Sequence, residues 1–184
     1  MDEAFRPGQA VEARPRLTEA CFPSYSYVPG LRAHPVTDAA AHTVGAVPGV
    51  PPPLCPKRWS ENRTYLYAID LFNHGYYWEA HEAWESLWHA AGRRGRTADW
   101  LKGLIKLTAT AVKLREGNAV GVRRHARRAS ELLRSVCPNG GRFAGLESAP
   151  IVDFLERLSV TSAPLVADPD KLLPVVLMPA LETG

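Results

Sequence analysis

The chain has 184 residues, of which 46% are apolar and 22% are charged. This length suits one ordinary domain with its own core, and the composition excludes wholesale disorder. A net charge of +3 at pH 7 is too small to indicate an acidic or basic partner. The sequence lacks an apolar run of about 18 residues, so we expect no membrane-spanning segment.

Three cysteines, Cys21, Cys55 and Cys137, are far apart and odd in number. This pattern favours free thiols over a disulfide framework or a C-x-x-C metal site. The first ten residues carry Asp2 and Glu3 and have no apolar core, so we expect no signal peptide. The sequence therefore predicts a cytoplasmic protein.

Residues 1–56 are expected to form an irregular, Pro-rich extension. They hold ten of the sixteen prolines, and proline removes a hydrogen-bond donor and disfavours helix in the residue before it. Apolar side chains such as Phe22 and Tyr27 leave two alternatives open: the extension packs along the folded part, or it is disordered.

Residues 57–158 are predicted to form an all-α domain, a compact bundle of about five helices. Ser60 is expected to cap the first helix, after which apolar residues recur at helical spacing. The helices are expected at about residues 60–75, 76–91, 98–116, 119–136 and 149–158. The third helix is apolar over about half its circumference and is predicted to be central. Residues 159–184 are expected to be an extended segment, and no strand is predicted.

Charge divides the predicted bundle into two helical hairpins. Residues 60–91 carry one Lys or Arg against five Asp or Glu, a net charge of −4. Residues 93–134 carry twelve against three, a net charge of +9. We therefore expect the acidic hairpin to pack against the basic one.

A polar pair on the second helix, His81 and Glu85, is the leading candidate site. The two residues are one turn apart at the edge of a tryptophan-rich apolar stripe. A histidine and a carboxylate are costly there unless other groups satisfy their donors and acceptors. Weaker ligand-binding candidates on the same helix are Glu82, His89 and Trp78.

Three interpretations of this pair stay open. In the first, His81 forms a structural hydrogen bond to Glu85 or to the first or third helix. In the second, His81 and Glu85 bind a divalent metal whose third ligand comes from another helix or from His89. In the third, His81 is an acid or base oriented by Glu85. The motif H-E-x-x-H of zinc proteases does not explain the pattern, because Glu85 stands where its second histidine would be.

Four arginines form a basic face on the fourth helix: Arg123, Arg124, Arg127 and Arg128. Such a face can bind nucleic acid, but no aromatic side chain is interleaved with the arginines to stack on a base. We therefore favour a solvated face, or one neutralised by the acidic hairpin or a second subunit. Lys102, Lys106 and Lys113 on the third helix are expected to form an ordinary solvated stripe.

Two sequence blocks resemble a known family. Residues 72–88 have the pattern F-N-x-G-x-Y-x-E-A-H-E-x-x-E-x-x-W, and residues 101–121 contain L-K-G-L-I-K-L followed by R-E-G-N-x-x-G. Both are similar to the signature of the bacterial and archaeal "domain of unknown function 309" family, over about residues 60–136. The resemblance implies a compact all-helical fold and no established activity. It places His81, Glu82 and Glu85 at the family's A-H-E-x-x-E positions.

We expect a cytoplasmic helical protein whose His81 and Glu85 form a polar site for a small ligand or a partner protein. The enzyme alternative is a metal-assisted hydrolase that uses the same two residues. The second alternative is nucleic-acid binding through the arginines of the fourth helix. The identity of the ligand, the presence of a metal and homo-oligomer formation stay open.

Overall fold

The computed structural model describes residues 14–29, 49–160 and 180–183. Within them, a 3-10 helix, η1 (Pro56–Glu61), precedes five α-helices and one short hairpin. The α-helices are α1 (Arg63–Asn73), α2 (Tyr77–Ala90), α3 (Arg96–Arg115), α4 (Ala119–Val136) and α5 (Ser148–Val160). Strands β1 (Arg142–Phe143) and β2 (Leu146–Glu147) pair antiparallel between α4 and α5. The predicted all-α class is confirmed.

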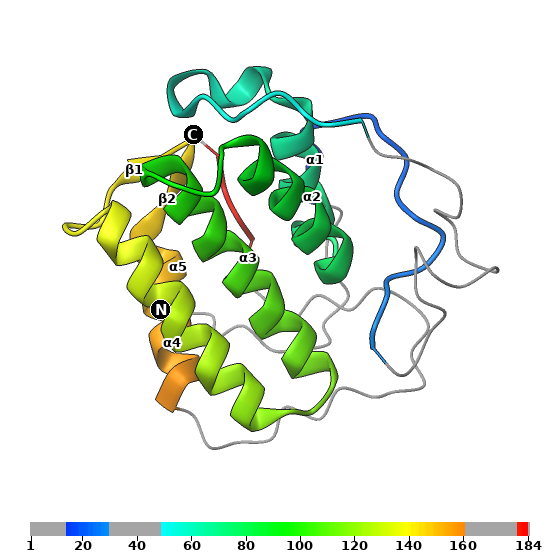
Figure 1. Cartoon of the computed structure of the whole chain (residues 1–184). Coiled ribbons are helices and arrows are strands. Elements are labelled where there is room, and N and C mark those ends of the chain that lie inside the picture. Colours follow the sequence, from blue (N-terminus) through cyan, green and yellow to red (C-terminus); the bar gives the residue numbers. More distant parts are fainter. Residues whose placement is uncertain (1–13, 30–48, 161–179, 184) are drawn as a thin grey trace.

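The central helix is α3, as predicted. It lies between α2 and α4, and α5 packs against α4 (Figure 1). Thirteen of its twenty residues are buried, and its Trp100 and the α2 residue Trp84 are fully buried in the core. A Cβ on Gly103 would lie 2.6 Å from Cδ2 of Leu133. Glycine at this position therefore lets α3 and α4 approach closely.

The start of α1 differs from the expectation. Ser60 lies inside η1, and the cap is Asn62, whose Oδ1 accepts a hydrogen bond from the backbone N–H of Tyr65 at 3.0 Å. Asn62 can do this because its own backbone is extended. The hairpin β1–β2 is also a correction, since two-residue strands are too short to show an alternating pattern.

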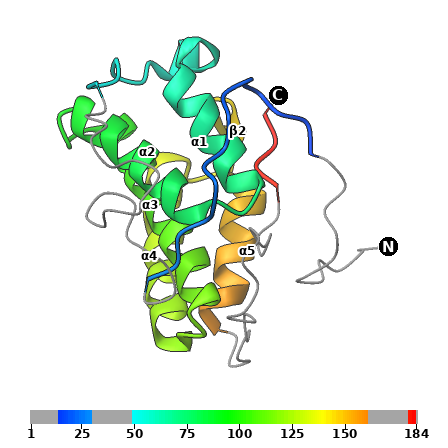
Figure 2. The ribbon, with the colours of Figure 1, turned by 90° about the vertical axis from the view of Figure 1, so that its right-hand side faces the viewer.

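Part of the Pro-rich extension packs against the helices. Residues 14–29, called the strap from here on, run along α1 and past the start of α2 (Figure 2). Tyr27 and Val28 of the strap are buried. The packed alternative therefore describes the strap, whereas residues 1–13 and 30–48 lie outside the described residues.

The C-terminal residues 180–183 also contact α1. The carboxamide of Asn73 donates to the carbonyl of Leu181 at 3.0 Å and accepts from its N–H at 2.7 Å. Thr183 forms an antiparallel bridge with Leu146 of β2. The expected extended form fits these four residues, while residues 161–179 lie outside the described part.

Gly145, in the turn between β1 and β2, leads to a first prediction. Its φ is +82°, and a Cβ there would lie 2.4–2.7 Å from the ring of Trp59. Gly145→Ala is therefore expected to lower the free energy of unfolding by about 2 kcal/mol, measured by urea denaturation. Gly92→Ala is the control, because Gly92 also has a positive φ (+72°) but open space around it. An equal loss in both variants would contradict the role of the Trp59 contact.

Candidate functional site

His81 is half-buried between α2 and α3. Its Nδ1 lies 3.3 Å from Oγ1 of Thr108. The Thr108 hydroxyl donates its single proton to the carbonyl of Ile105 at 2.7 Å. It therefore accepts a hydrogen bond from His81, which places the imidazole proton on Nδ1 and leaves a lone pair on Nε2.

The electrostatic surroundings keep His81 neutral. Burial lowers the pKa of the imidazole below its ordinary value of 6.5, and Lys106 adds to this effect, while Glu85 opposes it. Among the described residues, no hydrogen bond or ion pair joins His81 to Glu85. His81 is therefore an uncharged hydrogen-bond acceptor at neutral pH, with one carboxylate and one ammonium group nearby.

Trp78 connects His81 to the strap. The Trp78 and His81 rings are stacked, with centroids 5.8 Å apart and planes inclined by 11°. Tyr27 of the strap packs edge-on against the same indole, at 4.9 Å between centroids. Trp78, one of the weaker candidates from the sequence, thus lies in contact with both His81 and Tyr27.

A second histidine, His125 of α4, lies near the same position and was not selected from the sequence. Burial lowers the pKa of His125 to about 4, and the positive charges of Lys106, Arg124 and Lys113 add to the shift, as does His81. Lys106 therefore acts on a histidine on each side of α3. It is half-buried, as are Lys102 and Lys113 of the same stripe.

Two weaker candidates have other neighbours. His89 is exposed, and its Nδ1 accepts a hydrogen bond from Nε of Arg93 at 2.8 Å. Glu82 is half-buried and acts electrostatically on Glu79. The structure therefore does not bring His89 to His81 as a third ligand.

The metal interpretation lacks ligands. In the described ranges, no group of three or more His, Cys, Asp or Glu side chains is placed to hold a metal ion. His81 and Glu85 thus remain two candidate ligands without the third that a divalent metal site would need.

The arginine face of α4 is partly paired with acid. Arg128 contacts Glu131 at 2.9 Å, and Arg127 lies 3.8 Å from the same carboxylate. Arg124 is exposed and Arg123 is half-buried. Exposed ion pairs stabilise a fold only slightly, but Glu131 reduces the positive charge of this face.

Two buried carboxylates that were not selected from the sequence hold the strap, and the first is Asp70 of α1. Asp70 is fully buried. Its carboxylate accepts hydrogen bonds from the backbone N–H groups of Leu17 and Thr18, both at 2.8 Å, and from the Thr18 hydroxyl at 2.7 Å. The position of Asp70 inside an apolar run, residues 68–72, is the signal that could have identified it.

The second is Glu79 of α2, which is 7% exposed. Its Oε1 accepts a hydrogen bond from the backbone N–H of Tyr27 at 2.8 Å, whereas Oε2 has no hydrogen-bond partner among the described residues. Burial raises the pKa of Glu79 to about 7, and Glu82 adds to this, while the Tyr27 N–H and Arg115 oppose it. No helical pattern indicates this burial, because the strap covers the residue.

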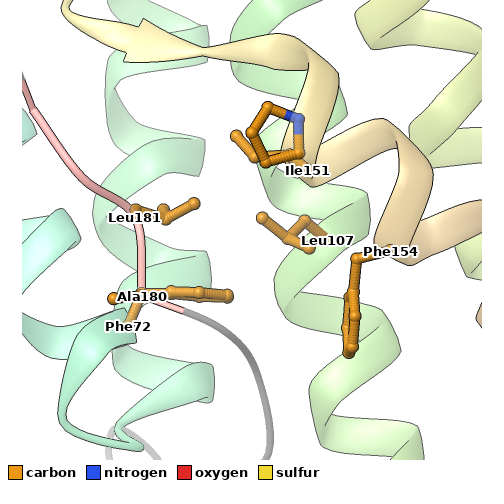
Figure 3. A pocket seen from close by; sticks show the side chains of 7 residues that line it. Phe72, Leu107, Ile151, Phe154, Ala180 and Leu181 are labelled. Carbon is orange, nitrogen blue, oxygen red and sulfur yellow. The ribbon is translucent and has the colours of Figure 1, made fainter. Parts of the chain in front are cut away.

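An apolar pocket lies between α1, α3, α5 and the C-terminal residues (Figure 3). It is lined by Phe72, Leu107, Pro150, Ile151, Phe154, Ala180 and Leu181. This lining offers no hydrogen-bonding side chain, and neither His81 nor Glu85 belongs to it. The pocket is therefore separate from the polar site.

Comparison with known proteins finds a family that is similar to part of the chain. None of the helices in the described part of the chain is long and apolar enough to cross a membrane. No curated protein matches the chain. Residues 65–125 match the model of the family described as "Domain of unknown function (DUF309)". This span covers most of α1, all of α2 and α3, and the first residues of α4. Over these residues, about a third of its length, the chain is similar to the DUF309 family.

Proposed function

We propose that the protein binds a small anionic ligand at His81. The observation that carries this proposal is the hydrogen bond from His81 to Thr108, at 3.3 Å. It occupies Nδ1 and leaves Nε2 of a neutral imidazole as an acceptor. A ligand hydroxyl is the complementary donor.

The charge of the ligand is inferred from Lys106. Lys106 acts on both His81 and His125, and it takes part in none of the ion pairs of the described residues. Inorganic phosphate, or the monoanion of a phosphate monoester, combines an O–H donor for Nε2 with negative oxygens for an ammonium group. We therefore propose a phosphate-bearing ligand, with His81 and Lys106 as its contacts and Glu85 beside them.

Titration with inorganic phosphate tests the proposal. We expect saturable shifts of the His81 imidazole signals in nuclear magnetic resonance spectra, and Lys106→Gln is expected to weaken the apparent affinity about tenfold. Lys102→Gln is the matched control, because Lys102 lies on the same helix but stands over the Trp88 ring at 5.7 Å. Shifts that do not saturate, or equal losses in both variants, would contradict the proposed site.

The tautomer of His81 gives a separate prediction. We expect ¹⁵N spectra to show Nδ1 protonated and Nε2 unprotonated at pH 7. Thr108→Val removes the acceptor at almost constant volume and is expected to abolish this preference and to cost about 1 kcal/mol of folding stability. Thr110→Val is the control and should keep the tautomer, because the Thr110 hydroxyl donates to the carbonyl of Lys106 at 2.9 Å. A wild-type spectrum with the proton on Nε2 would remove the basis of the ligand proposal.

The proposed location is the cytoplasm. Its support is chemical: Cys21, Cys55 and Cys137 are free thiols, and Cys21 is exposed. Exposed free thiols persist best in a reducing compartment.

A further inference from the structure

We propose that the face of α1 and α2 under the strap is a binding site for an extended peptide segment of a partner protein. The strap occupies this site as an intramolecular competitor. The inference is independent of the ligand proposed at His81, because it rests on the contacts of residues 14–29.

The face recognises mainly the backbone of its occupant. Asp70 binds two consecutive N–H groups, at Leu17 and Thr18, and Glu79 binds the N–H of Tyr27. Carboxylates that accept backbone N–H groups can hold any extended segment that presents those donors at the same separation. Recognition of this kind is not restricted to the strap's own sequence.

In the stretch between the two carboxylates, aromatic and hydroxyl side chains make the face selective for certain residues of the bound segment. The Phe22 ring lies 4.8 Å from the ring of His74 and 5.0 Å from that of Tyr76. Ser26 donates its hydroxyl proton to the carbonyl of Gly75 at 2.9 Å and accepts from Arg115 at 2.7 Å. The expected partner segment is therefore extended, with a hydroxyl residue, an aromatic residue four positions later, and a Ser-aromatic pair four positions after that.

The strap leaves one hydrogen-bond acceptor of the face without a donor. Oε2 of Glu79 is buried and has no hydrogen-bond partner in the described part of the chain. Leaving a buried acceptor without a partner is unfavourable, because its lost contact with water is not replaced. A segment that supplies one more donor at this position would bind more favourably than the strap, which gives a partner the means to displace it.

The acceptors and the occupant also belong to different parts of the chain. Asp70, Glu79 and Arg115 all lie within residues 65–125, which match the family model, whereas the strap lies outside them. The side chains that bind the strap are thus part of the segment that matches the family model. The strap is one of the segments that these side chains can bind.

The experiment measures binding of a peptide supplied as a separate molecule. The probe is a fluorescent synthetic peptide of residues 14–29, and the receptor is the full chain carrying Thr18→Pro and Tyr27→Pro. These changes remove three of the strap's donors, the N–H and hydroxyl of Thr18 to Asp70 and the N–H of Tyr27 to Glu79, and leave the residues of the face unaltered. Hydrogen exchange of residues 14–29 verifies that the strap is released. The control peptide carries proline at the same two positions.

We expect the released variant to bind the probe at least about tenfold more tightly than the wild-type chain, because the tethered strap competes at high effective concentration. Adding Asp70→Ala to the released variant, or using the control peptide, is expected to reduce binding at least about tenfold. A released variant that binds no better than wild type, or binding that is insensitive to Asp70→Ala, would overturn the proposal. Phosphate titration of His81 gives its own result in either case.

Discussion

Asp70→Ala is expected to lower the free energy of unfolding by about 3 kcal/mol, measured by urea denaturation. Asp70 is fully buried and accepts three hydrogen bonds from Leu17 and Thr18. Alanine leaves two backbone N–H groups and one hydroxyl of the strap without their acceptor. The strap should then detach, so its amide protons are expected to exchange much faster in the variant.

Thr18→Val is the matched control for this result. It removes only the hydroxyl bond to Asp70, at 2.7 Å, and keeps both backbone donors. We expect a loss of about 1 kcal/mol and little change in strap exchange. If Asp70→Ala costs no more than Thr18→Val, the strap does not depend on the buried carboxylate.

Glu79→Gln is expected to stabilise the protein at pH 8 by about 3 kcal/mol and to leave its stability almost unchanged near pH 4.5. Glutamine keeps an oxygen that can accept from the Tyr27 N–H, found at 2.8 Å in the wild-type chain, and it carries no charge that burial penalises. The magnitude follows from a folded-state pKa of about 7 against an ordinary value of 4.5, at about 1.4 kcal/mol per pKa unit.

The direction of the pH dependence follows from the same pKa values. Below pH 4.5 Glu79 is protonated in both the folded and the unfolded chain, so it contributes no penalty. As the pH rises from 4.5 to 7, the unfolded chain releases this proton first and wild-type stability falls. Glu79 interacts electrostatically with Glu82 on its own helix, with Tyr67 and Tyr76 beside it, and with Arg115 of α3.

The pH dependence can be measured by urea denaturation between pH 4.5 and 8. The difference between Glu79→Gln and wild type should grow across this range and level off above pH 7. Glu61→Gln is the control and should differ little from wild type, because Glu61 is exposed and its ion pair with Arg58, at 3.5 Å, stabilises the fold only slightly. A constant difference at all pH values would show that Glu79 is already ionised at the lowest pH.

The helices could be predicted from the sequence because each has an apolar stripe and a clear end. Gly75, with a φ of +84°, ends the first helical segment where a left-handed residue is needed, and the broad apolar arc of α3 identifies it as central. The cap at Asn62 was missed because two polar residues, Ser60 and Asn62, lie close together before α1. The sequence alone does not show that Ser60 lies inside a 3-10 helix.

The site was only partly predictable, because it depends on contacts between distant residues. The position of His81 at the edge of the stripe indicated a polar partner on a neighbouring helix, and Thr108 of α3 is such a partner. The roles of Lys106 and His125 depend on how α3 and α4 pack together. The burial of Glu79 depends on Tyr27, 52 residues earlier in the chain.

The pairing of Asn73 with Leu181 has a consequence for the order of folding. These residues are 108 positions apart, and the strap contacts on α1 and α2 span about 50 residues. Contacts between neighbouring helices close much shorter loops and form faster. The helical hairpins should therefore assemble first, and both flanking segments should attach afterwards to a preformed α1. In kinetic experiments, Asn73→Ala should then accelerate unfolding while leaving the refolding rate nearly unchanged.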